Sequence, residues 1–260
     1  MNKENRKNAS MAKPQKRRRR RRRGPGLLIP FFCLTLACAA VLTAVTIFFK
    51  VKTVEAVGET RYSKQEIVQA AGIETGENLI FINKIAAINR IFDGRPYLDE
   101  VSVRRRLPDT VEIYVTECAP AAAPPAAEGQ YWLMDKKGKL LELVSAEETG
   151  GLCAVVGLEL QQPEAGSYAD FLDKEKEKAL FTILNTATNS DILEEIINID
   201  INQIFEIRLR YTERFVVELG TVEDLTKKIG FLKSVVERLG EMDTGVIDLT
   251  NPQTARFRPE

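Results

Sequence analysis

The longest hydrophobic segment of the chain, residues 27–49, contains 23 residues without a charged side chain. A helix rises by about 1.5 Å per residue, so this segment is long enough to cross the roughly 30 Å hydrocarbon core of a bilayer. Seven consecutive arginines precede it at residues 17–23, and basic residues collect on the cytoplasmic side of membrane helices. The pattern predicts a single transmembrane helix with a cytoplasmic N-terminus and all residues after Lys50 outside.

A cleaved signal peptide is the alternative interpretation of this segment. Residues 37–39, Ala-Cys-Ala, are typical of a small-residue cleavage site, and Cys38 also suggests lipid attachment. However, the apolar run continues through residues 41–49, so cleavage would leave an apolar new terminus. Thr35 stands where lipid-attachment sites carry a branched apolar residue. We therefore favour a retained helix that acts as a passive tether.

Residues 50–118 show the alternation of hydrophobic and polar positions expected of a small β-α-α-β-β domain. Short strands alternate with a period of two residues, and helices begin at capping residues and end at glycine. The predicted elements are a strand over 51–57, a helix that the capping box of Ser63 and Glu66 opens and Gly72 ends, a second helix capped by Asn83, and a hairpin of 101–107 and 111–115.

Residues 130–260 show the pattern of a mixed β-rich domain with flanking helices. Short apolar runs separated by turn residues indicate strands, and apolar positions at helical spacing indicate two helices. The predicted elements are a hairpin that turns at 135–138, a strand over 152–156, a helix over 172–187, strands over 196–201, 204–210 and 215–219, a helix opened by Thr221 and Asp224, and a strand over 246–250 with a return over 255–259.

Residues 119–129, APAAAPPAAEG, separate these two regions and carry few side chains that can pack. Proline cannot join a central strand, which favours a semi-rigid linker. The fold class is therefore α+β: a basic tail over 1–26, a transmembrane helix over 27–49, a small domain over 50–118, a linker over 119–129 and a mixed domain over 130–260.

Charge is distributed unevenly along a chain that is formally neutral, with 37 basic and 37 acidic residues. Residues 1–26 hold twelve basic residues and one acid, Glu4, so the remainder has a net charge of −11. This composition predicts a disordered tail that lies on anionic lipid headgroups rather than on nucleic acid, because no aromatic residue interrupts the basic run. The residues that would contact the membrane surface are Arg17, Arg18, Arg19, Arg20, Arg21, Arg22 and Arg23.

The types of residue in the chain exclude several kinds of chemistry. The sequence has no histidine, which removes Ser-His-Asp and Cys-His catalysis and the commonest zinc ligand. Cys118 and Cys153 are 35 positions apart, so they are either bridged or free, and no metal-type cysteine spacing occurs. We expect no catalytic residue, no metal, no cofactor and no small-molecule substrate.

The order of these motifs resembles a POTRA domain, and more narrowly that of the FtsQ/DivIB family of bacterial cell-division proteins. The second half resembles the same family through its Asp-x-x-Gly turn at 135–138, Gly157, the helix after Leu219-Gly220, and Ile247-Asp248-Leu249. In the first half the resemblance rests on Val57-Gly58, Ser63 to Ile67, Gly72-Ile73, Gly76 to Leu79, Pro96, Val101, Val103 to Pro108, and the exit strand Val111 to Glu117 with Pro120. The family usually enters its second domain through a short strand, from which residues 119–129 depart.

The resemblance implies a scaffold of the division septum rather than a catalyst. Family members bind FtsB/DivIC-type and FtsL-type single-pass coiled-coil proteins, in a complex that helps license septal peptidoglycan synthesis. A sheet edge left open at a chain end accepts a partner strand by β-augmentation. The candidate partner-binding residues are Val246, Asp248, Thr250, Ala255 and Phe257. Phe257 is either an interface anchor or a side chain that closes the core.

Other classes of function are weighed against the scaffold. The acid pairs Glu147-Glu148 and Glu194-Glu195 raise the possibility of a cell-wall hydrolase, which needs two carboxylates flanking a glycosidic bond. Solvated charges on a loop or helix are the commoner explanation. Residues 104–106, three arginines, are an anion site or a solvated strand end. A membrane-anchored POTRA chaperone of secreted proteins is the remaining alternative, and septal localisation distinguishes it from a division protein.

Overall fold

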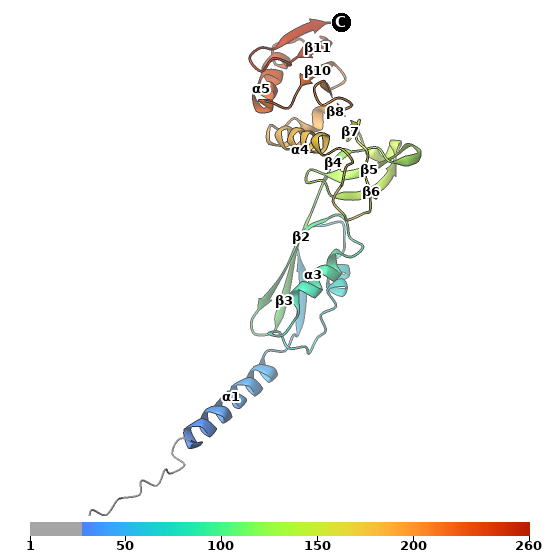
Figure 1. The fold of residues 1–260 in the computed structure, drawn as a ribbon. Helices are drawn as coiled ribbons and strands as arrows, with labels where there is room; N and C mark the ends of the chain where they lie inside the picture. Colours follow the sequence, from blue (N-terminus) through green and yellow to red (C-terminus); the bar gives the residue numbers. More distant parts are fainter. Residues whose placement is uncertain (1–27) are drawn as a thin grey trace, which may run out of the picture. The chain divides into compact units, whose positions relative to one another are not determined.

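The computed structural model describes residues 28–260, which fall into one unit that ends at Phe48 and another that begins at Phe49 (Figure 1). The first unit contains helix α1 (Leu28–Phe48). Within it, Ile29–Phe48 has a mean hydropathy of 2.4 and is long and apolar enough to cross a membrane. A single N-terminal apolar helix was predicted, and it is confirmed. The predicted tail with its seven arginines lies outside the described residues.

The second unit begins with a three-stranded sheet and two helices, in the predicted β-α-α-β-β order. Strand β3 lies in the centre of this sheet, parallel to β1 and antiparallel to β2. Ile67, Ile91, Leu98 and Ile113 are fully buried between the helices and the sheet. The elements are β1 (Thr53–Val57), α2 (Lys64–Ala71), α3 (Lys84–Phe92), β2 (Leu98–Arg106) and β3 (Thr110–Glu117).

Helix boundaries in this part of the chain follow the capping residues that were predicted from the sequence. The Ser63 hydroxyl accepts a hydrogen bond from the Glu66 N–H, which satisfies a free amide in the first turn of α2. Gly72 ends α2 in the left-handed conformation with φ 57°. The Asn83 side chain caps α3 in the same way as Ser63 caps α2.

The rest of the second unit is built on a nine-stranded mixed sheet in the order β12-β11-β10-β9-β8-β7-β4-β5-β6. Helices α4 (Lys174–Asn189) and α5 (Leu225–Val236) pack against it through one shared hydrophobic core. The strands are β4 (Pro120–Ala123), β5 (Gln130–Asp135), β6 (Leu140–Ser145), β7 (Cys153–Val156), β8 (Ile196–Asp200), β9 (Ile207–Tyr211), β10 (Phe215–Gly220), β11 (Gly245–Asp248) and β12 (Arg256–Pro259), with short 3-10 helices η1 (Ala127–Gly129), η2 (Ala146–Thr149) and η3 (Leu193–Glu195).

The predicted linker over 119–129 is wrong for the first part of that segment. Strand β4 runs antiparallel to β5 and parallel to β7, so it lies inside the sheet. Proline is absent from the strand interior, since Pro120 begins the strand and residues 124–125 follow it. Ala122 is fully buried in the core. The second domain therefore has the short entry strand that the sequence left in doubt.

Two helix starts also differ from the prediction. Helix α4 begins at Lys174, after Asp173 accepts hydrogen bonds from two backbone amides, so Leu172 precedes the helix and is exposed. Helix α5 begins at Leu225 without the predicted side-chain cap, and Asp224 adopts a left-handed backbone with φ 50°. The reason is that β10 continues through Gly220, which pairs with Ile207, so the following residues are needed to reverse the chain.

Candidate functional site

Strand β12 forms one edge of the nine-stranded sheet. It pairs antiparallel with β11, and no strand among residues 28–260 pairs with its other side. At the opposite end of the sheet, the start of β6 is covered by the segment around Ser167, which bonds to the N–H and C=O of Leu140. An uncovered edge strand presents free backbone donors and acceptors. The predicted return strand near the chain end is confirmed, and it carries the open edge.

The bonding pattern of the β11–β12 ladder decides which backbone groups of β12 remain open. The Glu260 N–H donates to Thr244 O at 3.1 Å, and an antiparallel ladder bonds every second pair of residues. Val246 and Arg258 therefore form the next bonded pair. The intervening Phe257 directs its N–H and its C=O away from β11. The open edge thus offers a donor and an acceptor at Phe257.

The Phe257 side chain is partly buried against the hydrophobic core. Its ring meets the buried ring of Phe215 edge to face, with the centroids 6.1 Å apart. Its neighbours Arg256 and Arg258 are exposed, and Arg258 forms an ion pair with Glu218 at 2.6 Å. The ring therefore contributes to the core, whereas the backbone at the same position faces the open edge.

Four of the five predicted partner-binding residues do not lie on the open strand β12, and only Phe257 does. The prediction that residues 246–250 belong to the free edge is wrong, because β11 pairs with β10 on one side and with β12 on the other. The Asp248 carboxylate accepts hydrogen bonds from the Thr250 hydroxyl at 2.7 Å and from its N–H at 3.0 Å. These bonds lower the pKa of Asp248. Their role is to shape the turn after β11. Ala255, next to β12, is partly buried.

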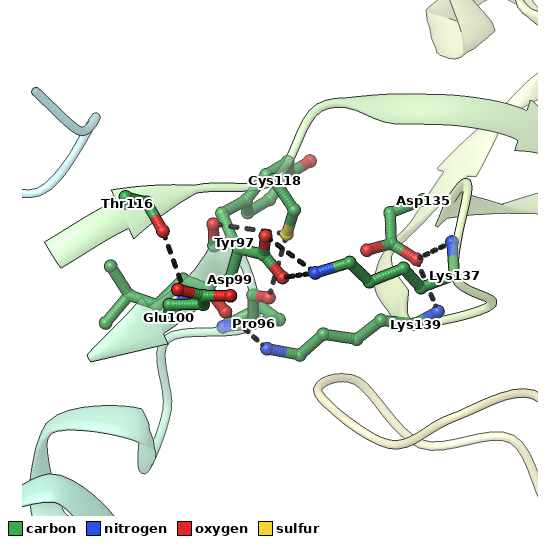
Figure 2. Close-up of polar contacts among 10 residues, drawn as sticks. Pro96, Tyr97, Asp99, Glu100, Thr116, Cys118, Asp135, Lys137 and Lys139 are labelled. Atoms are coloured by element: carbon green, nitrogen blue, oxygen red, sulfur yellow. Dashed lines mark hydrogen bonds and ion pairs between the residues drawn. The ribbon is translucent and has the colours of Figure 1, made fainter. Parts of the chain in front are cut away.

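A second group of contacts joins the three-stranded sheet to the nine-stranded sheet (Figure 2). Lys139 is 7% exposed, and its ammonium donates to Leu98 O at 2.6 Å. Buried Asp135 stabilises the turn over residues 135–138, which precedes Lys139. Its carboxylate accepts hydrogen bonds from the N–H groups of Lys137 and Lys139 at 2.9 and 2.7 Å. The Lys137 ammonium pairs with Asp99 at 2.7 Å. We call this group, with the apolar contacts below, the domain junction.

An apolar cluster completes the domain junction. Its buried members are Tyr97, Cys118, Leu133, Leu141 and Val144. The Tyr97 hydroxyl donates to Glu142 at 2.9 Å, and burial together with this carboxylate raises the pKa of Tyr97. The Cys118 thiol donates to Tyr97 O at 3.2 Å, and burial raises its pKa as well. Cys118 and Cys153 are both free thiols.

Sequence reasoning missed the domain junction, although part of its signal is visible in the sequence. Lys139 follows directly on the Asp-x-x-Gly turn, where a carboxylate that caps the turn also fixes the next residue. Tyr97 follows Pro96 at the entrance to β2. Neither position shows that a strand from the second domain packs there, because that depends on the tertiary arrangement.

One member of each acid pair considered for hydrolysis has a structural partner. Glu148 accepts hydrogen bonds from the N–H and hydroxyl of Ser145, which lower its pKa and cap η2. Glu195 accepts a hydrogen bond from the Tyr211 hydroxyl. Among residues 28–260, no group of three or more Cys, Asp or Glu side chains is placed to hold a metal ion.

Residues 28–260 comprise one N-terminal apolar helix, a small β-α-α-β-β domain and a β-rich domain whose last strand has an unpaired side within this part of the chain. Residues 49–117 match the family model described as POTRA domain, FtsQ-type. The chain is 26% identical to the cell division protein DivIB of Clostridium botulinum strain Loch Maree over 227 residues, covering 86% of this chain and 87% of that protein. It is 27% identical to the cell division protein FtsQ of Corynebacterium glutamicum over 194 residues, covering 74% and 81%. Over most of its length the chain is therefore similar to bacterial cell division proteins named DivIB and FtsQ, and residues 49–117 match the FtsQ-type POTRA model.

Proposed function

We propose that this protein is a membrane-anchored scaffold of the division septum. It binds small single-pass coiled-coil proteins of the FtsB/DivIC and FtsL types and helps to control septal peptidoglycan synthesis. The observation that carries the proposal is the open outer side of β12 at the end of the nine-stranded sheet. Similarity over most of the chain to cell division proteins named DivIB and FtsQ supports the division role.

Partner binding proceeds by addition of a strand to β12. The partner's backbone bonds to the outward N–H and C=O of Phe257, and its side chains lie over the exposed face that carries Arg256 and Arg258. Strand addition takes most of its affinity from backbone groups, so the partner needs an extended segment in register with β12. Val246, Asp248 and Thr250 support this edge from within the sheet.

Proline at position 257 is expected to weaken partner capture more than alanine at the same position. Phe257→Ala removes the ring but keeps the outward N–H, whereas Phe257→Pro removes both. Relative to alanine, proline additionally loses one backbone hydrogen bond to the partner, about 0.5–1.5 kcal/mol, and its pyrrolidine ring can clash with the added strand. The measurement is affinity capture of the tagged full chain from membranes, with quantification of small single-pass partners.

Phe205→Ala is the matched control, because Phe205 is 75% exposed in the turn between β8 and β9. It should leave capture unchanged. Trp132, the one tryptophan of the chain, is buried in the core and reports by fluorescence whether each variant folds. Folded alanine and proline variants that capture partners equally well would show that the binding surface lies elsewhere, with the POTRA domain as the next candidate.

The proposed orientation places the N-terminus inside the cell and both domains outside, with the tail of Arg17–Arg23 on anionic headgroups. A protease added to intact, wall-stripped cells should then remove the domains and leave a protected fragment of about the first 50 residues. Immunoblotting against tags at the two ends measures this. Complete protection of both tags would contradict the orientation.

A further inference from the structure

One end of the POTRA domain carries apolar side chains that the core does not use. Their exposed fractions are 38% for Ile80, 68% for Phe81, 73% for Ile85 and 60% for Leu107. We call these four residues the basal patch. Single exposed apolar residues are ordinary, but several gathered on neighbouring segments mark an interaction surface.

Hydrogen bonds bring the segments of the basal patch together. The Leu79 N–H donates to Phe49 O at 2.7 Å, which joins the loop before α3 to the first residue of the second unit. The Arg105 guanidinium donates to Ile82 O at 3.0 Å, which joins that loop to the end of β2. The Lys52 N–H donates to Asp109 O at 2.8 Å and so places the β2–β3 turn beside the same entry segment.

The basal patch is surrounded by basic residues. Residues 49–52, 78–85 and 104–109 contain six basic side chains and one acid, Asp109, in contrast to the net charge of −11 for residues 27–260. Asp109 is paired with Lys52 at 2.8 Å. Among residues 28–260, Lys50, Lys84 and Arg105 take part in no ion pair, so they are available to an anionic surface.

The length of the connection brings the basal patch to the membrane. Helix α1 has 21 residues, about 31 Å at 1.5 Å per residue, which matches the hydrocarbon core of a bilayer. Only Phe49 and Lys50 separate its end from Val51, which is 1% exposed in the POTRA core. Two extended residues span about 7 Å, which is about the depth of one headgroup layer. Phe49 and the loop bonded to it therefore lie at the bilayer surface.

We propose that the basal patch docks on an anionic phospholipid bilayer. Phe81, Ile85 and Leu107 enter the interfacial layer, and Lys84 and Arg105 contact lipid phosphates. The docking restricts rotation of the POTRA domain on its anchor and explains why these apolar side chains are exposed. The proposal rests on the membrane anchoring included in the proposed function, and it does not depend on which side of the membrane the domain occupies.

The test places a tryptophan in the basal patch of the full chain by Phe81→Trp. The protein is reconstituted into phosphatidylcholine vesicles with or without phosphatidylglycerol, made with acyl chains that are brominated or unmodified. The parent chain, with buried Trp132 alone, gives the background emission. Docking predicts that the emission added by Phe81→Trp is blue-shifted and that brominated lipid quenches most of it. The matched control, Phe205→Trp, should keep its emission, because that exposed ring lies in the β-rich domain.

A second variant separates docking from mere closeness to the anchor. Adding Ile85→Ser and Leu107→Ser to Phe81→Trp leaves the tether unchanged, so docking predicts that quenching is lost. The proposal is overturned if quenching is unchanged in this triple variant. It is also overturned if the Phe81→Trp chain inserts into the vesicles and its added tryptophan is not quenched. Equal quenching with and without phosphatidylglycerol overturns the assignment to anionic lipid.

The same samples distinguish this proposal from the proposed function. Flotation with the vesicles shows whether the chain inserts, and failure to insert overturns both the anchoring and the docking. Normal quenching in a chain that captures no division partner contradicts the scaffold and leaves the docking supported. Partner capture by a chain whose added tryptophan is not quenched contradicts the docking and leaves the scaffold supported.

Discussion

Gly157→Ala is expected to lower the free energy of unfolding of the β-rich domain by about 3 kcal/mol or more. Gly157 follows β7 with φ +92°, where a side chain is strained at a cost of roughly 1–3 kcal/mol. An added Cβ would also lie 2.4 Å from Asn202 N and 2.6 Å from Ile201 C. These are backbone atoms next to β8 that cannot rotate away, so overpacking adds roughly another 1–3 kcal/mol. Urea unfolding followed by Trp132 fluorescence measures the change.

Gly150→Ala separates the two contributions. Gly150 also has a left-handed backbone, with φ +64°, but nothing lies within 4 Å of the Cβ that alanine would add. We expect a loss of about 1 kcal/mol from backbone strain alone. If both variants lost the same small amount, the close contact between the β7 turn and residues 201–202 would not be rigid in solution.

The predictable parts of this fold are those that local chemistry determines. Ser63, Gly72 and Asn83 mark helix ends because their side chains or backbone satisfy the ends of the helix itself. The element order of the POTRA domain and the final hairpin of β11 and β12 follow from the same local patterns. None of these predictions needed knowledge of which strands are neighbours.

The parts that sequence reasoning missed depend on neighbours distant in the chain. Strand β4 is made of proline and alanine, which have low strand propensity, and it forms because β5 and β7 flank it. The sequence predicts an open edge at residues 246–250 as well as 255–259, because strand order is not visible in a sequence, and β11 instead lies between β10 and β12. Lys139 and Lys228 are buried, although nothing in the sequence around them distinguishes them from surface lysines. Each donates instead to backbone carbonyl groups, at Leu98 for Lys139 and at Leu219 and Thr221 for Lys228.

Lys139→Met is expected to open the domain junction and to accelerate alkylation of Cys118 by about tenfold or more. Methionine keeps the unbranched apolar stem of lysine but lacks the ammonium. The substitution therefore leaves Leu98 O without its donor and removes a cation 5.1 Å from the centre of the Phe92 ring. Loss of a buried hydrogen bond from a charged group costs roughly 1–3 kcal/mol, and 1.4 kcal/mol is a factor of ten in an equilibrium. Opening also exposes the Cys118 thiol and lowers its pKa towards the ordinary value of about 8.5, which increases the reactive thiolate.

Two internal comparisons decide whether the junction is the cause. Cys153 lies in β7, where burial raises its pKa to about 12, so its alkylation should stay slow in the same Lys139→Met sample. Lys137→Met removes an ion pair whose side chains are 45% and 26% exposed, and solvent screens such exposed pairs, so little effect on the junction is expected. Peptide mass spectrometry follows the two thiols separately. Equal acceleration by both lysine substitutions would assign the effect to the turn at Asp135, and acceleration at Cys153 as well as Cys118 would indicate global unfolding instead of junction opening.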